Sequence, residues 1–131
     1  LVLATLHTPD APQTIERIID VFPAHQQQQV KLQLASALQG VVAQRLLPRA
    51  NGEGRVLATE IMVATSGIRN LIREHAIEQI PTAIQTGSSY GMLTMDKCLQ
   101  RLYQDGTITY ETALMNVNDV EEFKQLLRKE K

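Results

Sequence analysis

RVLATEIMVATSGIRNLIRE, residues 55–74, is the stretch that decides the fold, because it passes directly from a strand pattern into a helix pattern. Its first half, residues 55–63, is rich in β-branched and apolar side chains, which predicts a strand. Its second half places Ile68, Leu71 and Ile72 at i, i+3 and i+4, which predicts an amphipathic helix that Thr65 or Ser66 can cap. A strand followed at once by a helix favours an α/β protein.

The polar face of that helix carries an unusual pair of charges. Arg69 and Arg73 lie at i and i+4, and Asn70 and Glu74 have the same spacing. Two arginines one turn apart gain nothing from each other. The residues alone leave two interpretations open, a plain solvated face and a surface that meets an anionic group or a partner protein.

The residues that precede this stretch predict half of an α/β unit at the start of the chain. LVLATL, residues 1–6, has apolar side chains on both faces, which predicts a buried parallel strand. Asp10 is suited to cap a following helix, Pro12 fits its first turn and Pro23 ends it. The apolar stripe of this helix consists of Ile15, Ile18, Ile19 and Phe22.

Between these two parts, the sequence predicts a long helix and a hairpin turn. The helix extends from near residue 26 to residue 46, with Val30, Leu34, Leu38, Val41 and Val42 facing inward. PRANGEG, residues 48–54, then predicts a hairpin turn between short strands that end near Leu47 and begin near Arg55.

Beyond residue 74 the patterns are helical. We expect helices at 77–85, after Thr94, at 111–115 and at 119–129. The helix after Thr94 has Met95, Cys98, Leu99 and Leu102 on one face and Gly106 just past its end. Asn118 and Glu121 form a capping-box pattern before the last helix. The second half of the chain is therefore expected to be a small helical bundle.

Composition narrows the function classes. The net charge of −1 gives no electrostatic case for non-specific binding to nucleic acid or to an anionic membrane. A single cysteine, Cys98, excludes an internal disulfide and fits a reducing, cytoplasmic environment. No apolar run is long enough to insert into a bilayer. Because the sequence begins inside an apolar run without methionine, we predict that it is the back part of a longer protein.

The candidate binding residues lie in TLHT, residues 5–8. This segment falls at the C-terminal end of the expected parallel strand, where open α/β sheets bind ligands. His7 can hydrogen-bond a phosphate, and Thr5 and Thr8 add hydroxyl groups. The alternative is a loop histidine without a ligand. The chain has no phosphate-loop motif and no Cys/His spacing suited to a metal, so we predict no metal site.

Two charged residues carry weaker predictions. Glu60 is an acid inside the apolar 55–63 strand, where it needs a partner, and a structural ion pair with Arg45 or Arg55 is favoured over catalysis. Arg17 is expected on the exposed face of the first helix. It is a candidate for a subunit contact or for a surface salt bridge with Asp20 or Glu16.

Several stretches, taken in order, resemble one family. LVLATLHT, TIERIIDVFP, GRVLATEIMVATSGIRNLIRE and AIQTGSSYGMLTMDKCLQRLYQDGTIT are similar to the C-terminal portion of the PilT-type ATPases, the type IV pilus retraction (twitching motility) branch of the secretion ATPase family. The resemblance covers essentially the whole chain. Assembly and secretion relatives carry a zinc-binding cysteine cluster after QRL, whereas here residues 45–54 contain no cysteine, which favours the retraction branch.

The resemblance implies a fold and a function. Residues 1–65 would be the C-terminal part of a RecA-like P-loop NTPase core, with its Walker A and B motifs upstream, and residues 66–131 a helical C-terminal region. The whole protein would be a homo-hexameric, cytoplasmic motor that binds ATP and Mg²⁺ and powers pilus retraction. It would lie at the inner membrane through contacts with the pilus machinery. The fragment alone is expected to bind no cofactor and to hydrolyse no ATP.

The resemblance also implies roles for individual residues. TLHT matches the end of the family's His box, so His7 would lie near the γ-phosphate as a catalytic residue, with Thr5 and Thr8 close to the nucleotide. GIRNLIRE matches the family's AIRNLIRE retraction motif, which assigns the motif residues Ile68, Arg69, Asn70, Leu71, Ile72, Arg73 and Glu74. Gly67 replaces the usual alanine, which would loosen the helix start by up to about 1 kcal/mol.

Two other functions remain open from the sequence. One is a non-enzymatic helical module that docks on a partner through the Arg69/Arg73 face. The other is an accessory pilus ATPase related to PilT.

Overall fold

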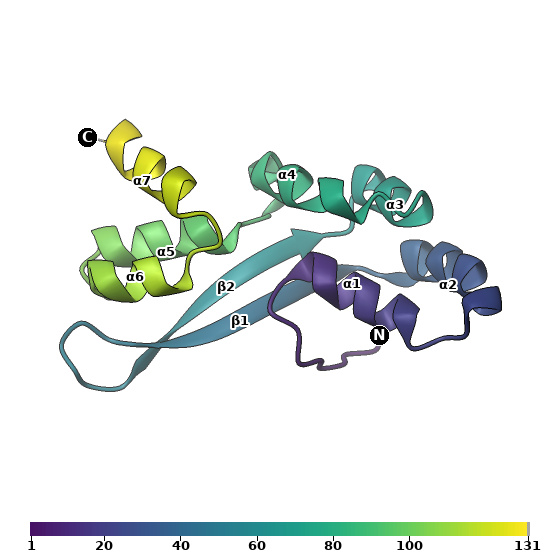
Figure 1. The fold of residues 1–131 in the computed structure, drawn as a ribbon, viewed down its shortest axis with the longest axis horizontal. Coiled ribbons are helices and arrows are strands. Elements are labelled where there is room, and N and C mark those ends of the chain that lie inside the picture. The colour runs from purple at the N-terminus through teal and green to yellow at the C-terminus, as the bar shows by residue number, and fades with distance from the viewer. Residues whose placement is uncertain (131) are drawn as a thin grey trace.

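A long antiparallel hairpin forms the axis of the molecule (Figure 1). The computed structural model describes residues 1–130. Strand β1 (Gly40–Pro48) pairs with β2 (Arg55–Val63) in a register that sets Gly40 opposite Val63 and Pro48 opposite Arg55. The strand at 55–63 and the turn at 48–54 are thus confirmed.

The predicted helix from residue 26 to residue 46 is wrong in its second half. Helix α2 (Ala24–Ala37) ends at Ala37, nine residues before the predicted end, and residues 40–46 belong to β1. Val41 and Val42 are β-branched and suit a strand, and the backbone of this segment pairs with β2. Val42, expected to face inward, is 56% exposed.

The predicted buried strand at residues 1–6 is also wrong. The segment is extended but pairs with no strand among the described residues, and the side chains of Leu1, Val2 and Leu3 are largely exposed. A strand forms only when its backbone groups find a neighbouring strand. Here β1 and β2 pair with each other, and neither accepts this segment as a neighbour.

The helices otherwise follow the sequence pattern. They are α1 (Ala11–Asp20), α3 (Ser66–Arg73), the 3₁₀ turn η1 (Ile77–Gln79), α4 (Ile80–Gln85), the 3₁₀ turn η2 (Ser88–Tyr90), α5 (Met95–Gln104), α6 (Tyr110–Asn116) and α7 (Val120–Lys129). Asp10 and Thr65 cap α1 and α3 as expected, and Thr94 caps α5. The last cap is Asp119, which accepts from the Glu122 amide, so the prediction of Asn118 is wrong by one residue.

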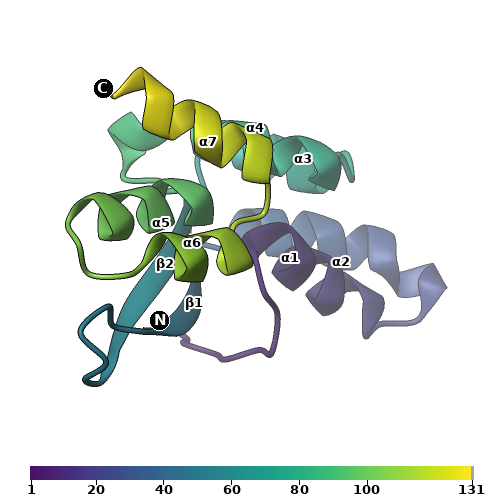
Figure 2. The ribbon, with the colours of Figure 1, turned by 60° about the vertical axis from the view of Figure 1, so that its left-hand side comes forward.

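In the part of the chain that the structure describes, two separate apolar cores lie along the hairpin. One joins α1, α2, α3 and α4 to the Val63 end of β2, and the other joins α5, α6 and α7 to the half of the hairpin nearer its turn. Figure 2 shows these two groups of helices beside each other. The architecture is the mixed α/β fold expected from the sequence, while the division between residues 65 and 66 stays a prediction. No helix within residues 1–130 is long and apolar enough to cross a membrane.

Candidate functional site

A hollow lies between the segment that precedes α1 and the exposed side of that helix. It has a volume of about 480 Å³. It brings together three of the residues singled out from the sequence, His7, Thr8 and Arg17, whereas Thr5 does not line it. Its other lining residues are Leu6, Pro9, Gln13, Glu16 and Asp20.

Hydrogen bonds at the start of α1 hold one wall of this hollow. The Thr14 hydroxyl donates to the carbonyl oxygen of Asp10 at 2.7 Å. The Thr8 and Thr14 hydroxyl oxygens are 2.6 Å apart, and because the Thr14 proton is already used, Thr8 is the donor. Residue 8 is therefore fixed against α1.

The hollow has the donor groups that an anion needs. The Arg17 guanidinium and the His7 imidazole are both exposed and can donate to phosphate oxygens. The predicted alternative, a salt bridge from Arg17 to Asp20 or Glu16, does not occur among residues 1–130. Both acids nevertheless line the hollow, so a bound anion would compete with them for Arg17.

Helix α3 contains the motif residues 68–74. Ile68 and Ile72 are buried in the first core, and Leu71 packs against it. At Gly67 an added Cβ would meet only the Thr65 hydroxyl oxygen, at 3.9 Å. The apolar face of this helix is therefore structural.

The two arginines of α3 do different things. Arg69 Nη1 donates to the carbonyl oxygens of Ala35 at 2.6 Å and Ser36 at 3.0 Å, at the C-terminal end of α2. Arg73 is exposed, as are Asn70 and Glu74. The expectation of one shared Arg69/Arg73 face is therefore wrong: Arg69 binds within the chain, and Arg73 alone of the pair faces outward.

Glu60 has a different partner from the one expected. Its side chain is 6% exposed, and its Oε1 accepts a 2.9 Å hydrogen bond from the Ala11 amide at the start of α1. Arg45 instead donates to the Asn116 carbonyl and, at 3.4 Å, to Asn118 Oδ1. The predicted ion pair with Arg45 or Arg55 is wrong, because an unpaired amide of the first turn of α1 supplies the donor.

Burial raises the pKa of the Glu60 carboxyl above its ordinary value of 4.5. The negative charge of Asp10 acts in the same direction, while the Ala11 and Met95 amides and the positive charge of Arg45 oppose it. Glu60 is thus a buried carboxyl group whose ionised form is stabilised chiefly by the Ala11 amide at the N-terminus of α1.

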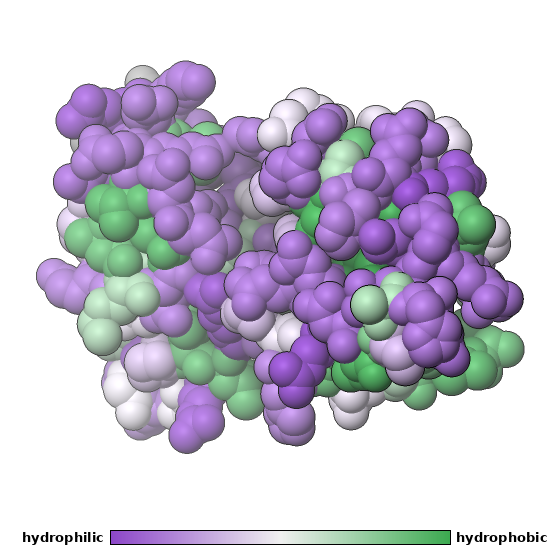
Figure 3. Space-filling model, turned by 45° about the vertical axis from the view of Figure 1, so that its right-hand side comes forward, coloured by the Kyte–Doolittle hydropathy of each residue, from purple (hydrophilic) through white to green (hydrophobic). Residues whose placement is uncertain are grey.

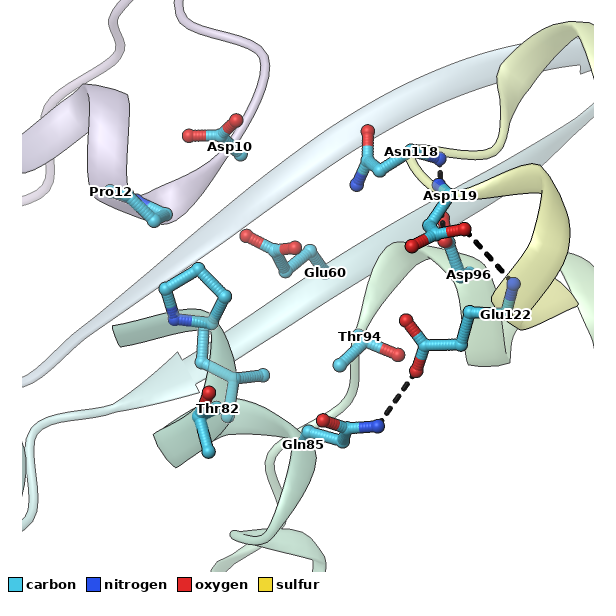
Figure 4. Close-up of a pocket in the computed structure, with 12 residues that line it drawn as sticks. Asp10, Pro12, Glu60, Thr82, Gln85, Thr94, Asp96, Asn118, Asp119 and Glu122 are labelled. Atoms are coloured by element: carbon cyan, nitrogen blue, oxygen red, sulfur yellow. Dashed lines mark hydrogen bonds between the residues drawn. The ribbon is translucent and has the colours of Figure 1, made fainter. Parts of the chain in front are cut away.

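A second cleft, missed by the sequence analysis, separates the two groups of helices (Figure 3). It has a volume of about 470 Å³ and is lined by Asp10, Pro12, Glu60, Pro81, Thr82, Ile84, Gln85, Thr94, Asp96, Asn118, Asp119 and Glu122. Figure 4 shows Glu60 between Asp10 on one side and Asp96 on the other. The signal available in the sequence was the acids next to residues 94 and 118, Asp96 and Asp119, for which no binding role was predicted.

The carboxylates of this cleft are occupied by the protein itself. Asp96 accepts from the Asn118 amide at 2.8 Å and the Asp119 amide at 3.0 Å. Glu122 Oε1 accepts from Gln85 Nε2 at 2.7 Å, which joins α4 to α7 across the cleft (Figure 4). Within residues 1–130 no group of three or more His, Cys, Asp or Glu side chains is placed to hold a metal ion. These acids therefore fix the helices relative to one another.

Comparison with known proteins gives consistent matches. The sequence profile described as "Type II/IV secretion system protein" matches residues 1–129. The chain is 50% identical over 113 residues to the type IV pilus retraction ATPase PilT of Pseudomonas aeruginosa, which covers 86% of this chain and 33% of that protein. It is 47% identical over 113 residues to a twitching motility protein of Neisseria gonorrhoeae, with 86% of this chain and 30% of that protein covered. The chain is 36% identical over 128 residues to the type IV pilus ATPase PilU of P. aeruginosa, which covers 98% of this chain and 34% of that protein.

Solved structures give the same result. A crystal structure of the pilus retraction motor PilT with bound ADP superposes with a TM-score of 0.80 at 43% identity, covering 92% of this chain and 33% of that one. The ATPase DotB of Legionella pneumophila superposes with a TM-score of 0.68 at 16% identity, covering 83% of this chain and 29% of that one. At this identity the likeness is one of fold alone. The chain spans about a third of the length of the curated relatives it matches.

Proposed function

This chain belongs to the type II/IV secretion system protein family, and from that premise we propose that it is the C-terminal portion of an ATP-driven motor that retracts type IV pili and powers twitching motility. The 50% identity to a pilus retraction ATPase carries this proposal, because it extends over 86% of the chain. The likeness in fold to an ADP-bound retraction motor supports it independently.

We propose that the hollow beside α1 faces the phosphates of ATP in the whole protein. The residues present fit such a group: the Arg17 guanidinium and the His7 imidazole offer donors, and Thr8 holds its segment against α1. Thr5 would lie close by without lining the hollow. Bound ATP, with Mg²⁺, supplies the phosphoanhydride bond whose hydrolysis drives the motor.

His7 has the chemistry that the proposed catalytic role requires. An imidazole can donate a hydrogen bond to a phosphate oxygen and stabilise negative charge that develops there. Arg17 can do the same from α1, and its exposed side chain also supports the proposal that it contacts a neighbouring subunit. Its two acidic neighbours, Glu16 and Asp20, would weaken its hold on an anion and so favour release.

We propose that the exposed side of α3 meets another part of the motor or the pilus machinery. The donors and acceptors free to do so are on Asn70, Arg73 and Glu74, since Arg69 is engaged with α2. The motor would be a homo-hexamer on the cytoplasmic side of the inner membrane. Residues 1–65 would belong to its ATPase core and residues 66–131 to its helical C-terminal region.

The similarities rank the other two functions lower. A helical docking module without enzymatic function would not account for matches to ATPases over most of the chain. An accessory pilus ATPase is a closer rival, but the identity to PilU is 36%, against 50% to PilT of the same organism.

A chimera tests the proposal directly. Residues 1–131 would replace the matching segment of P. aeruginosa PilT, and twitching would be measured in a strain without its own PilT. Restored twitching, at a protein level equal to that of native PilT, supports a retraction motor. If the chimera is present in the cell, is folded and hydrolyses ATP but restores no twitching, the proposal is contradicted. If the chimera instead rescues a strain that lacks PilU, the accessory function is indicated.

A further inference from the structure

The segment formed by β2 and α3 is bonded to both helices that precede it in the chain. Glu60 on β2 accepts from the Ala11 amide at the start of α1. Arg69 on α3 donates to the Ala35 and Ser36 carbonyls at the end of α2. Only residues 64 and 65 separate β2 from α3. One continuous segment therefore holds the beginning of α1 and the end of α2.

The charge of each residue matches the helix end that it contacts. The amides at a helix N-terminus carry a partial positive charge, and the carbonyls at a C-terminus carry a partial negative charge. Glu60 is an acid at the first kind of end, and Arg69 is a base at the second. Both contacts also satisfy backbone groups that have no partner inside their own helix.

These contacts add directed polar bonds between elements that the first core already packs together. Helix α1 has Ala11, Ile15 and Ile19 buried in the first core, and two backbone amides of its first turn donate to Asp10 and Glu60. Figure 4 shows that Glu60 reaches toward this turn from the strand below. The same helix presents Arg17 to the hollow that contains His7. A shift of α1 at the hollow would therefore reach β2 through the Glu60–Ala11 bond.

We propose that Glu60 and Arg69 are positioning residues that couple the hollow beside α1 to the exposed side of α3. This inference rests on the proposed function, since it takes the hollow to face nucleotide. Movement of α1 pulls on β2 through Glu60, and it also moves α2, which follows α1 directly in the chain and pulls on α3 through Arg69. The exposed Arg73 side then changes its position together with the nucleotide side, as one rigid unit.

Amide hydrogen exchange in the full-length protein, with and without ADP, tests this coupling. In the wild-type protein we expect ADP to lower deuterium uptake in the peptides of both α1 and α3. Glu60→Met keeps the length of the side chain but removes the acceptor, so ADP should still lower uptake in α1 while the response in α3 is lost. Glu60→Gln retains an oxygen that can accept from Ala11 and should restore the α3 response.

Arg69→Met provides a second, independent variant. It removes both bonds to α2 and keeps most of the aliphatic stem, and we expect the same loss of the α3 response to ADP. If Glu60→Met does not fold, this variant alone decides the question. A merely structural role would raise uptake in both helices without ADP and would leave the nucleotide response of α3 in place.

The outcomes separate this inference from the function beneath it. An α3 response that persists unchanged in both methionine variants overturns the coupling. A wild-type protein that binds ADP but shows no response in α3 also overturns the coupling and leaves the proposed function standing. A full-length wild-type protein that binds no ADP overturns both.

Discussion

The guanidinium of Arg69 donates to the carbonyl oxygen of Ala35 at 2.6 Å and so joins α3 to the end of α2. The neighbouring arginine of the same motif, Arg73, is exposed. Two residues one helical turn apart thus have separate roles, one inside the fold and one on its surface. The difference between them can be measured.

Arg69→Met should destabilise the fold far more than Arg73→Met. Removing Arg69 leaves the Ala35 and Ser36 carbonyls without their charged donor, which costs about 1.5–3 kcal/mol of unfolding free energy. Within residues 1–130 Arg73 makes no hydrogen bond of this kind, so its substitution should change the unfolding free energy by less than about 0.5 kcal/mol. Urea unfolding of both variants makes the comparison, and equal effects would show that the α2 contact contributes nothing.

Glu60 should give stability a measurable dependence on pH. Its pKa in the folded protein is raised above 4.5 by burial and by Asp10, so the folded state holds this proton more tightly than the unfolded state does. The unfolding free energy contributed by this group is present below pH 4.5 and is lost as the pH rises through the folded pKa.

Glu60→Gln, which cannot ionise, isolates that contribution. The difference in unfolding free energy between the variant and the wild type should grow in favour of the variant as the pH rises from 4.5 toward neutrality. Urea unfolding at a series of pH values measures it. A difference that stays constant with pH, or grows in favour of the wild type, would mean that the amides of Ala11 and Met95 outweigh burial.

Gly67→Ala should stabilise the protein by up to about 1 kcal/mol, because alanine restricts the unfolded chain and favours the helix. The space is open, since the nearest atom to the new Cβ is the Thr65 hydroxyl oxygen at 3.9 Å. Gly40→Ala is the matched control, and there the Cβ would lie 2.9 Å from the Met62 carbonyl oxygen. Thermal unfolding should show a higher Tm for Gly67→Ala and a lower Tm for Gly40→Ala. A lower Tm for Gly67→Ala would contradict the conclusion that a Cβ fits at this position without strain.

His75→Gly should also raise stability. His75 follows α3 with φ of 55°, in the left-handed region that costs a side chain roughly 1 kcal/mol and costs glycine little. The His75 amide donates to the Ile72 carbonyl at 3.1 Å and the Ala76 amide to that of Leu71 at 2.8 Å, so the turn itself would remain. Urea unfolding tests this, and a loss of stability would mean that the imidazole makes a compensating contact.

Local patterns in the sequence predicted local structure well. Spacing of apolar residues located α1 and α3, and Asp10 and Thr65 cap these helices as predicted. The matches to known proteins confirm the family resemblance. It could be predicted because it depends on motifs read in order, such as GIRNLIRE, and recognising a motif needs no knowledge of contacts.

Features that depend on distant partners could not be predicted. The apolar pattern of residues 1–6 is that of a strand, but a strand also needs a neighbour, which the pattern cannot supply. Glu60 and Ala11 lie 49 residues apart in the sequence, and Arg69 and Ala35 lie 34 apart. Nothing in either local pattern signals that an acid or a base will meet the end of a particular helix.

The measurement that bears most directly on the motor function is ATP turnover by the full-length protein, beside the same protein with His7→Ala. We predict steady turnover in the presence of Mg²⁺ that falls by roughly a hundredfold in the variant, the usual effect of removing one donor to the transition state. Unchanged turnover in the variant would remove His7 from catalysis. A correctly folded full-length protein that hydrolyses no ATP would contradict the assignment of this chain to a pilus motor.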